Sequence, residues 1–249
     1  MSLTGSLIFS LPAASLFGGF MASNLTGKSI VCLQLASSVI AAAIIIGKNK
    51  ELNGLARKSR TFIREFLKGR DVLDYYLLRN KQGEHNSLER IYARTCERMV
   101  KLLDPDMRRS VIGRQSGAEN AALSPREIEL VRGMCESTVQ EEEISIERGM
   151  ALLATIVTAS PMLGLLGTVW GVLDAFAAMG DKGTVLLSEI APAISAALVT
   201  TVVGLLVAIP CAICYNNIAT KARHLTTDMD SFADELLGRI ACEFQGREG

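Results

Sequence analysis

Two threonines, Thr168 and Thr201, lie within long stretches of the chain that carry no acidic or basic residue. Their hydroxyl groups can pass or coordinate a proton, but they titrate far outside the physiological range. The carboxylate nearest to Thr168 in the sequence is Asp174, at the end of one of these stretches. Asp174 could collect cations at the mouth of a path, or it could simply lie at the level of the lipid headgroups, and the sequence allows both.

Proton relays through membranes normally use titratable side chains, which are costly there and usually functional. Residues 149–173 and 190–220 contain no acidic or basic side chain. If ions pass these threonines, the titrating carboxylate must therefore come from a partner chain.

The elements that would position the threonines are membrane helices. A helix needs about 20 apolar residues to cross the hydrocarbon core. The charge-free stretches predict an all-α membrane protein with transmembrane helices over 29–47, 150–179 and 189–218. Residues 1–28 are also uncharged up to Lys28, but Pro12, Gly18 and Gly19 interrupt them, so we expect an outer-side segment with an interfacial helix. A fourth span over 3–21 is the alternative.

Basic residues set the expected orientation. They follow the first and third spans closely, whereas only Lys28 precedes the first. We expect a periplasmic N-terminus, a cytoplasmic helical domain over 48–149, a short periplasmic loop over 180–188 and a cytoplasmic tail over 219–249.

Helical periodicity continues beyond the spans. It extends the first span to Gly69 and predicts an amphipathic helix after Gly83 that ends at Asp104. Ser124–Glu127 forms a capping box sequence, and no comparable stop precedes Met179, which predicts one long helix. The third span is expected to continue inward in the same way. The apolar positions of the amphipathic helix and of the third span's extension are Leu88, Ile91, Tyr92, Met99, Val100, Leu103, Leu225, Met229, Phe232, Leu236 and Leu237.

Small residues form a stripe on each of the last two spans, which marks close helix contact. Pro161 and Pro210 add freed backbone carbonyls within the spans. The stripes could merely pack against each other or a neighbouring subunit, or they could line a central channel that holds the helices of another protein. The stripe residues are Gly164, Thr168, Gly171 and Ala175 in the second span, with Gly167 completing a GxxxG, and Ala193, Ala197, Thr201, Gly204, Ala208 and Cys211 in the third.

Other function classes find little support in the sequence. The 249 residues carry 26 basic and 26 acidic side chains, so no net charge favours nucleic acid. His85 and His224 are isolated in polar segments, and the Cys211–Cys214 pair has no histidine or second pair beside it, which favours packing over metal binding. We expect no enzyme activity, no cofactor and no metal.

Two segments closely resemble the second and third spans of the TolQ/ExbB family. Residues 154–180 contain Gly-Leu-Leu-Gly-Thr-Val-Trp-Gly, and residues 190–218 contain Ile-Ala-Pro, Thr-Thr, Ala-Ile-Pro and Tyr-Asn. The resemblance implies a homopentamer around a small single-span partner of the TolR or ExbD type, whose membrane aspartate carries the proton. It implies proton-driven rotation that does work on the cell envelope, with Thr168 and Thr201 as the two pore threonines.

One position departs from that family pattern. Family members usually have a glutamate four or five residues before the third-span threonine, where this chain has Ala196. Either the glutamate is dispensable, or Ser195 or Asp174 takes part of its role, or coupling differs. Thr200 adds a second hydroxyl next to Thr201, and we include it in the candidate ion path.

Within the family, residues 175–180 look more like the TolQ type, which serves the Tol-Pal system and envelope constriction at cell division through a TolA-like protein. The alternatives are an ExbB type that energises TonB-dependent transport and a passive membrane scaffold. A MotA-type flagellar stator fits less well, because it would have two spans before the cytoplasmic domain.

Overall fold

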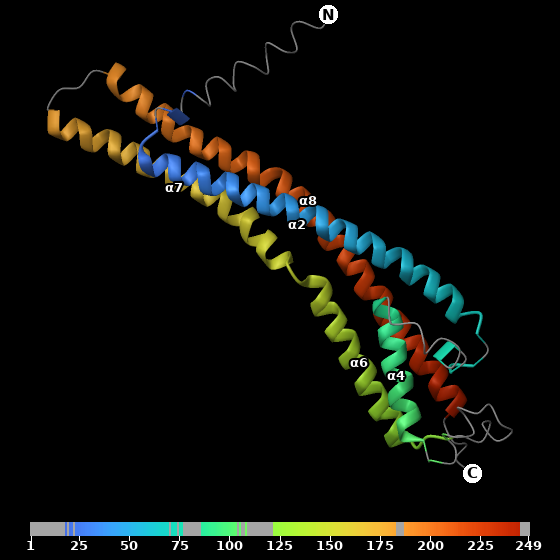
Figure 1. The fold of residues 1–249 in the computed structure, drawn as a ribbon. Helices are drawn as coiled ribbons and strands as arrows, with labels where there is room; N and C mark the ends of the chain where they lie inside the picture. The colour runs from blue at the N-terminus through green and yellow to red at the C-terminus, as the bar shows by residue number, and fades with distance from the viewer. Residues whose placement is uncertain are drawn as a thin grey trace, which may run out of the picture. The chain divides into compact units, whose positions relative to one another are not determined.

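The computed structural model describes residues 18, 20–21, 23–69, 71–73, 75–76, 86–103, 105, 108, 122–182 and 187–244. Its main elements are all helices, as predicted, and three helices are long and apolar enough to cross a membrane. The helices in Figure 1 are α2 (Leu25–Phe66), α4 (Ser87–Leu102), α6 (Pro125–Glu147), α7 (Met150–Lys182) and α8 (Leu187–Phe244).

The chain forms two compact units, each built from two separate stretches of sequence. The first, here called the membrane unit, comprises Met1–Lys48 and Gly149–Ile218; the second, called the helical domain, comprises Asn49–Arg148 and Ala219–Gly249. The long helices α2 and α8 contribute one part to each unit. The spans expected over 29–47, 150–179 and 189–218 all lie within the membrane unit.

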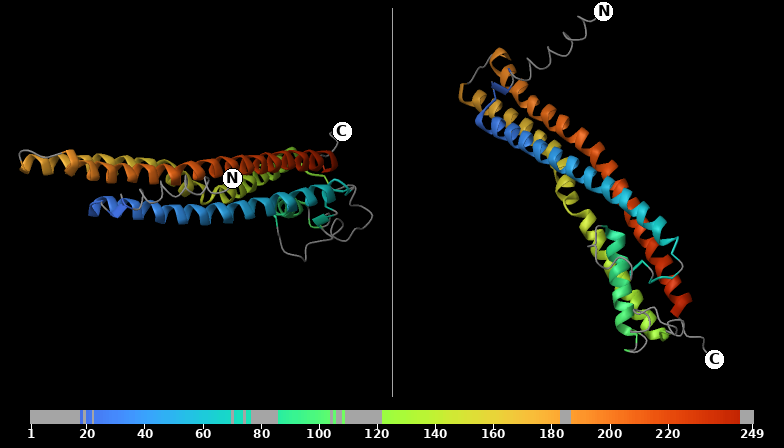
Figure 2. Two further views of the ribbon diagram at one scale, coloured as in Figure 1. Left: turned by 90° about the horizontal axis from the view of Figure 1, so that it is seen from above. Right: turned by 45° about the vertical axis from the view of Figure 1, so that its right-hand side comes forward.

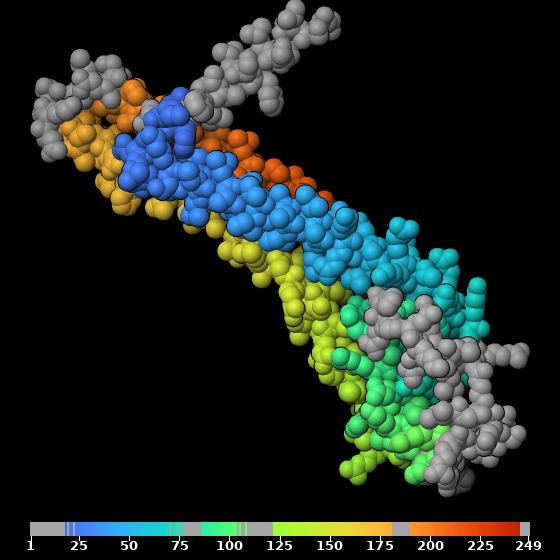
Figure 3. Space-filling view, viewed as in Figure 1, coloured from blue at the N-terminus to red at the C-terminus, as the bar shows by residue number. Residues whose placement is uncertain are grey.

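In the membrane unit, the first part of α2 lies alongside α7 and α8 (Figure 2). One face of α2 is buried at intervals of seven residues, at Gln34 and Ala41, and Gly27 precedes them on the same face. Figure 3 shows one side of this segment uncovered. Leu33, Val39 and other large apolar side chains of α2 are exposed. Such a surface suits contact with lipid or with another apolar chain.

The helical domain has its own aromatic core. The rings of Phe62 and Phe66 from α2 contact Tyr92 from α4 and Phe232 from α8, with ring centroids 5.1–5.8 Å apart. The apolar faces predicted for α4 and for the end of α8 are buried, which confirms both. Because burial disfavours the thiolate, it raises the pKa of the buried Cys96 and Cys135 thiols in this domain.

The C-terminal end of α8 forms hydrogen bonds with the segments that precede α4 and α6. The backbone N–H of Val72 donates to both carboxylate oxygens of Glu243, and that of Leu123 donates to Phe244 O at 2.7 Å. The Tyr92 hydroxyl donates to Val72 O. The last turns of α8 therefore hold two stretches that are distant in sequence, and Tyr92 of α4 holds the first of them as well.

The capping box predicted at Ser124 is present. Glu127 N–H donates to Ser124 Oγ at 3.3 Å, and Ser124 N–H donates to a carboxylate oxygen of Glu127 at 2.8 Å. Because hydrogen bonds favour the charged form, those from the backbone and then the side chain of Ser124 lower the pKa of Glu127.

The single long helix expected from this cap to Met179 is interrupted. α6 ends at Glu147 and α7 begins at Met150, with Gly149 between them at a φ of 84°. Glycine adopts this left-handed conformation without a Cβ penalty and commonly ends helices. The sequence contained the signal, a glycine after Arg148, but the apolar run that follows obscured it.

The interfacial helix predicted within 3–21 lies mainly outside the described residues, because the structure describes only Gly18, Phe20 and Met21 of that range.

Candidate functional site

The small-residue stripe of α7 packs against α8 of the same chain. A Cβ atom added at Gly164 would lie 2.8 Å from Thr201 Cα, and one at Gly171 would lie 2.5 Å from Ala197 Cβ. At Gly167 it would lie 2.3 Å from Thr200 Oγ1. All three distances are below those of real Cβ contacts, so these glycines permit the close approach of the two helices.

Two adjacent hydroxyls of α8 converge on one carbonyl of α7. Thr201 Oγ1 donates to Gly164 O at 2.8 Å, and Thr200 Oγ1 lies 3.1 Å from the same oxygen and 2.7 Å from Ala197 O. The Thr168 hydroxyl, four residues beyond Gly164, donates to Leu165 O in its own helix at 2.7 Å. The structure therefore brings Thr200 and Thr201 together at one turn of α7, and Thr168 begins the next turn.

Gln34 of α2 is a polar member of this site that the sequence analysis missed. Its side chain is fully buried, and Nε2 donates to Ser160 O at 3.2 Å and to Thr200 O at 3.3 Å. One amide thus bridges α2 to both α7 and α8. The sequence could have indicated it, because Gln34 is the single amide in a span without charged residues and lies seven residues after Gly27 and seven before Ala41.

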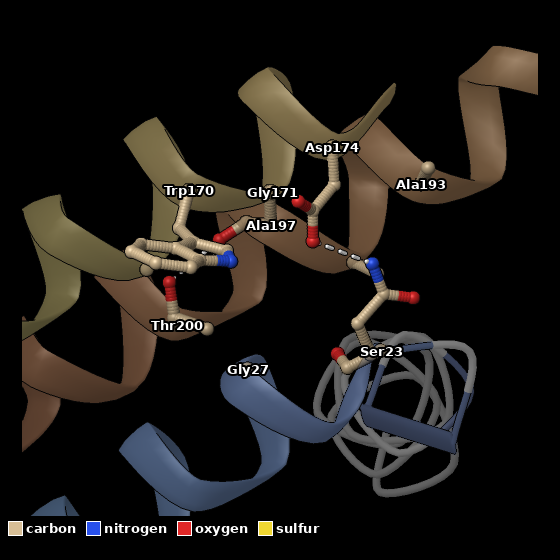
Figure 4. Close-up of a pocket in the computed structure, with 11 residues that line it drawn as sticks. Ser23, Gly27, Trp170, Gly171, Asp174, Ala193, Ala197 and Thr200 are labelled. Atoms are coloured by element: carbon tan, nitrogen blue, oxygen red, sulfur yellow. Dashed lines mark hydrogen bonds between the residues drawn. The ribbon is translucent and has the colours of Figure 1, made fainter. Parts of the chain in front are cut away.

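A pocket between the three helices contains the one carboxylate of the site (Figure 4). Asp174 accepts a hydrogen bond from Asn24 Nδ2, with 3.0 Å between Nδ2 and Oδ2, and the side chain of Trp170 lies beside it along α7. The pocket has an empty volume of about 360 Å³, part of which is open solvent. Its other lining residues are Ser23, Gly27, Gly167, Gly171, Ala193, Ala196, Ala197 and Thr200.

The remaining predicted residues occupy different surroundings. Ser195 is exposed and lies outside the pocket, whereas its neighbour Ala196 is buried and lines it. Pro161 and Pro210 lie inside α7 and α8. Gly204 packs against Ser160 O, and Ala208 is buried one turn further along α8.

This arrangement suits proton handling by hydroxyls, backbone carbonyls and one carboxylate. Each threonine hydroxyl donates its own proton to a carbonyl, so its lone pairs are free to accept a hydrogen bond from a proton donor. No group of three or more histidine, cysteine or acidic side chains placed to hold a metal ion occurs among the described residues.

The fold and site define a multi-pass membrane protein whose helices pack through small residues around buried hydroxyls. Residues 86–231 match the profile of the MotA/TolQ/ExbB proton channel family. The chain belongs to this family, and so to a family of membrane proton channels.

Curated relatives of both the TolQ and the ExbB type support this assignment. The chain is 30% identical to the Tol-Pal system protein TolQ of Haemophilus influenzae over 219 residues, 87% of this chain and 89% of the relative. It is 37% identical to the TolQ of Pseudomonas aeruginosa over 97 residues, 39% of this chain and 42% of the relative. It is 40% identical to the biopolymer transport protein ExbB of Neisseria gonorrhoeae over 92 residues, 37% and 42% of the two chains.

Proposed function

We propose that this protein is a proton-channel subunit of an inner-membrane motor that uses the proton motive force to do work on the cell envelope, in the manner of TolQ. The observation that carries the proposal is the convergence of Thr200 and Thr201 on Gly164 O, in spans without an acidic or basic side chain at that level. Hydroxyls alone do not titrate near neutral pH, so a partner must bring the carboxylate.

The proposal includes the assembly and the orientation expected from the sequence. We propose a homopentamer around a TolR- or ExbD-like protein with one span and a membrane aspartate, acting on a TolA- or TonB-like protein. In this arrangement the Thr168 and Thr201 faces line the channel, the N-terminus is periplasmic and the C-terminus is cytoplasmic.

The TolQ role is favoured over the ExbB role by the extent of similarity. The Haemophilus influenzae TolQ aligns with 87% of this chain and 89% of its own length. The Pseudomonas putida ExbB, at the same 30% identity, aligns with 75% of this chain but only 52% of its own length. An ExbB-like subunit energising TonB-dependent transport is the second candidate.

Purification from native membranes, followed by reconstitution, tests the motor proposal. We expect the chain to co-purify with a small protein whose single N-terminal span contains aspartate. Proteoliposomes containing both chains should take up protons when an inside-negative potential is applied, and those containing this chain alone should not. A homo-oligomer that never captures such a partner, in a strain with intact envelope function, would support a passive scaffold instead.

Asp174 supplies a further prediction. Ala196, where the family glutamate is expected, lines the same pocket as Asp174, which supports Asp174 as its functional substitute. Asp174→Asn removes the charge but keeps an oxygen that can accept from Asn24. We expect proton uptake with the partner to fall at least about tenfold, since positioned acid–base groups typically contribute more than that.

Restoring the carboxylate from the other helix provides the matched control. Ala196→Glu in the Asp174→Asn background should regain most of the lost uptake, because both side chains point into one pocket. Ser195→Glu places a carboxylate one residue away, on an exposed position, and should not rescue. Normal uptake in Asp174→Asn alone would mean that Asp174 merely lies at headgroup level.

A further inference from the structure

The carboxylate of Asp174 has no cationic side chain beside it in the described part of the chain. Its oxygen Oδ2 accepts a hydrogen bond from the neutral amide of Asn24 at 3.0 Å, and the residue takes part in no ion pair there. Ionisable groups within membrane spans are costly and usually pair with an opposite charge. A positively charged group therefore has a favourable place in this pocket, which is partly open to solvent and admits it without separation of the helices.

The indole of Trp170 lines the same pocket. Trp170 and Asp174 are four positions apart on α7, so they lie on neighbouring turns of one helix face. Figure 4 shows both side chains on the side of α7 that faces the pocket. An indole attracts a cation that lies over its ring within about 6 Å of the centroid. A carboxylate next to an indole therefore favours a cationic ligand.

The chemistry of the pocket favours an organic ammonium over a metal ion. Hard metal cations such as Ca²⁺ take several oxygen ligands, most of them from acidic side chains. No group of three or more acidic, histidine or cysteine side chains placed for this purpose occurs among the residues that the structure describes. An ammonium group needs only one carboxylate and gains from the aromatic ring as well.

The same face of α7 becomes apolar and open toward the middle of the span. Its residues, each four positions from the next, are Met162, Leu166, Trp170 and Asp174. Met162, Leu166 and Trp170 are 67%, 49% and 45% exposed. At 1.5 Å per residue this strip is about 18 Å long, close to the roughly 15 Å of one hydrocarbon leaflet. The order of carboxylate, indole and aliphatic side chains matches the order of headgroup, interface and acyl chain in a phospholipid.

The hydrogen-bonding capacity of Asp174 indicates which kind of ammonium fits. Its second oxygen, Oδ1, accepts no hydrogen bond in the described ranges of the chain. A primary ammonium carries three N–H donors, and one of them can bond to this oxygen. A quaternary ammonium has no N–H and can offer only its charge. The primary ammonium therefore satisfies both the charge and the open acceptor of Asp174.

We propose that the Asp174 pocket binds the headgroup of a phospholipid with a primary ammonium, such as phosphatidylethanolamine. The ammonium donates to Asp174 and lies against the ring of Trp170, while an acyl chain lies along Leu166 and Met162. In the orientation proposed above, this lipid belongs to the outer leaflet. The site requires only the geometry of α2, α7 and α8 and goes beyond the proposed motor function.

Trp170 reports on this site directly, because it is the single tryptophan of the chain. The full-length protein is reconstituted in phosphatidylcholine vesicles with a small, fixed fraction of lipid that carries bromine on its acyl chains, which quenches indole fluorescence on contact. We expect brominated phosphatidylethanolamine to quench more than the same fraction of brominated phosphatidylcholine. The relative binding constant should favour it by about threefold, as for a partly exposed ion pair. Brominated phosphatidylglycerol, which is anionic, should show no preference over phosphatidylcholine.

Substitutions in the pocket separate the ammonium contact from ordinary lipid contact. Asp174→Asn keeps the shape of the side chain but removes its charge, so the two brominated lipids should quench equally. Asp174→Glu keeps a carboxylate and should retain the preference. Ala193→Leu places a larger side chain in the lining of the pocket and should reduce the preference. Ala191→Leu makes the same change at an exposed position outside the lining and should not alter it.

Free ethanolamine distinguishes a lipid headgroup from a soluble amine. Because it has no acyl chain to lie along α7, it should leave the quenching by brominated phosphatidylethanolamine unchanged. Displacement of the brominated lipid by ethanolamine would identify a soluble amine as the ligand and overturn the lipid site. Equal quenching by the two brominated lipids in the wild type, or a preference that survives in Asp174→Asn, would also overturn it. Because these vesicles contain no partner and no membrane potential, failure of the motor proposal leaves the result standing.

Discussion

Replacing Thr168 and Thr201 together by valine is expected to abolish motor output while the oligomer still assembles. Valine matches threonine in shape but cannot pass or coordinate a proton. The cost to packing is small, because Gly164 O retains Thr200 Oγ1 at 3.1 Å after the Thr201 hydroxyl is lost. One net hydrogen bond is worth about 0.5–1.5 kcal/mol. Proton uptake with the partner should fall by about a hundredfold or more, in line with the loss of positioned proton-transfer groups.

The matched control removes two hydroxyls of the same kind from α7. Thr155 and Thr158 are exposed and donate to Ala151 O and Ala154 O of their own helix. Thr155→Val with Thr158→Val should leave uptake and envelope function unchanged. Unchanged envelope function of the Thr168/Thr201 double variant, at normal yield of the oligomer, would favour a passive scaffold.

The second large effect is expected from Gly167→Ala, which should reduce the yield of folded oligomer and lower its thermal midpoint. The added Cβ would lie 2.3 Å from Thr200 Oγ1 and 2.7 Å from Thr200 Cβ, so α7 and α8 must separate or shift. Overpacking of this kind typically costs about 1–3 kcal/mol. Thermal unfolding of detergent-solubilised oligomer, followed by size-exclusion chromatography, measures the loss.

The three atoms nearest to a Cβ at Gly167 all belong to the side chain of Thr200, so a second substitution at Thr200 can relieve the clash. Thr200→Gly removes all three of the nearest atoms, so adding it to Gly167→Ala should recover stability relative to Gly167→Ala alone. Gly204→Ala meets the backbone oxygen of Ser160 at 2.6 Å and should have no such side-chain rescue. Gly47→Ala, with nothing within 4 Å, should be neutral or slightly stabilising. A stable Gly167→Ala protein would contradict the close α7–α8 contact.

Much of the fold follows from local signals. A membrane span has to be apolar over its whole length, so the absence of charge identified the three helices that are long and apolar enough to span a membrane without knowledge of any contact. The buried face of α4 and the cap at Ser124 are also local, because they depend on periodicity and on a four-residue hydrogen-bond pattern. The break at Gly149 was missed because a glycine within a helical pattern is often tolerated at a cost of about 1 kcal/mol.

The candidate site was only partly predictable, since it depends on which helix faces which. The small stripes indicated close contact, but spacing along a helix does not identify its partner. Contacts in the structure show that Gly164, Gly167 and Gly171 meet α8 of the same chain. Asp174 and Ala196 line one pocket although they belong to two different helices. The hydrogen bonds of Gln34 connect three helices. No sequence periodicity encodes such combinations.

The aromatic core of the helical domain can be completed only late in the synthesis of the chain. Phe62 and Tyr92 are made early, but their partner Phe232 and the carboxylate of Glu243 emerge only after α7 and the first part of α8. Because the ribosome adds about 5–20 residues per second, the segment that contains Phe62 and Tyr92 lacks these partners for several seconds or longer. During this interval its apolar surface is uncovered, so nascent chains should need chaperone or translocon protection until the last helix is released.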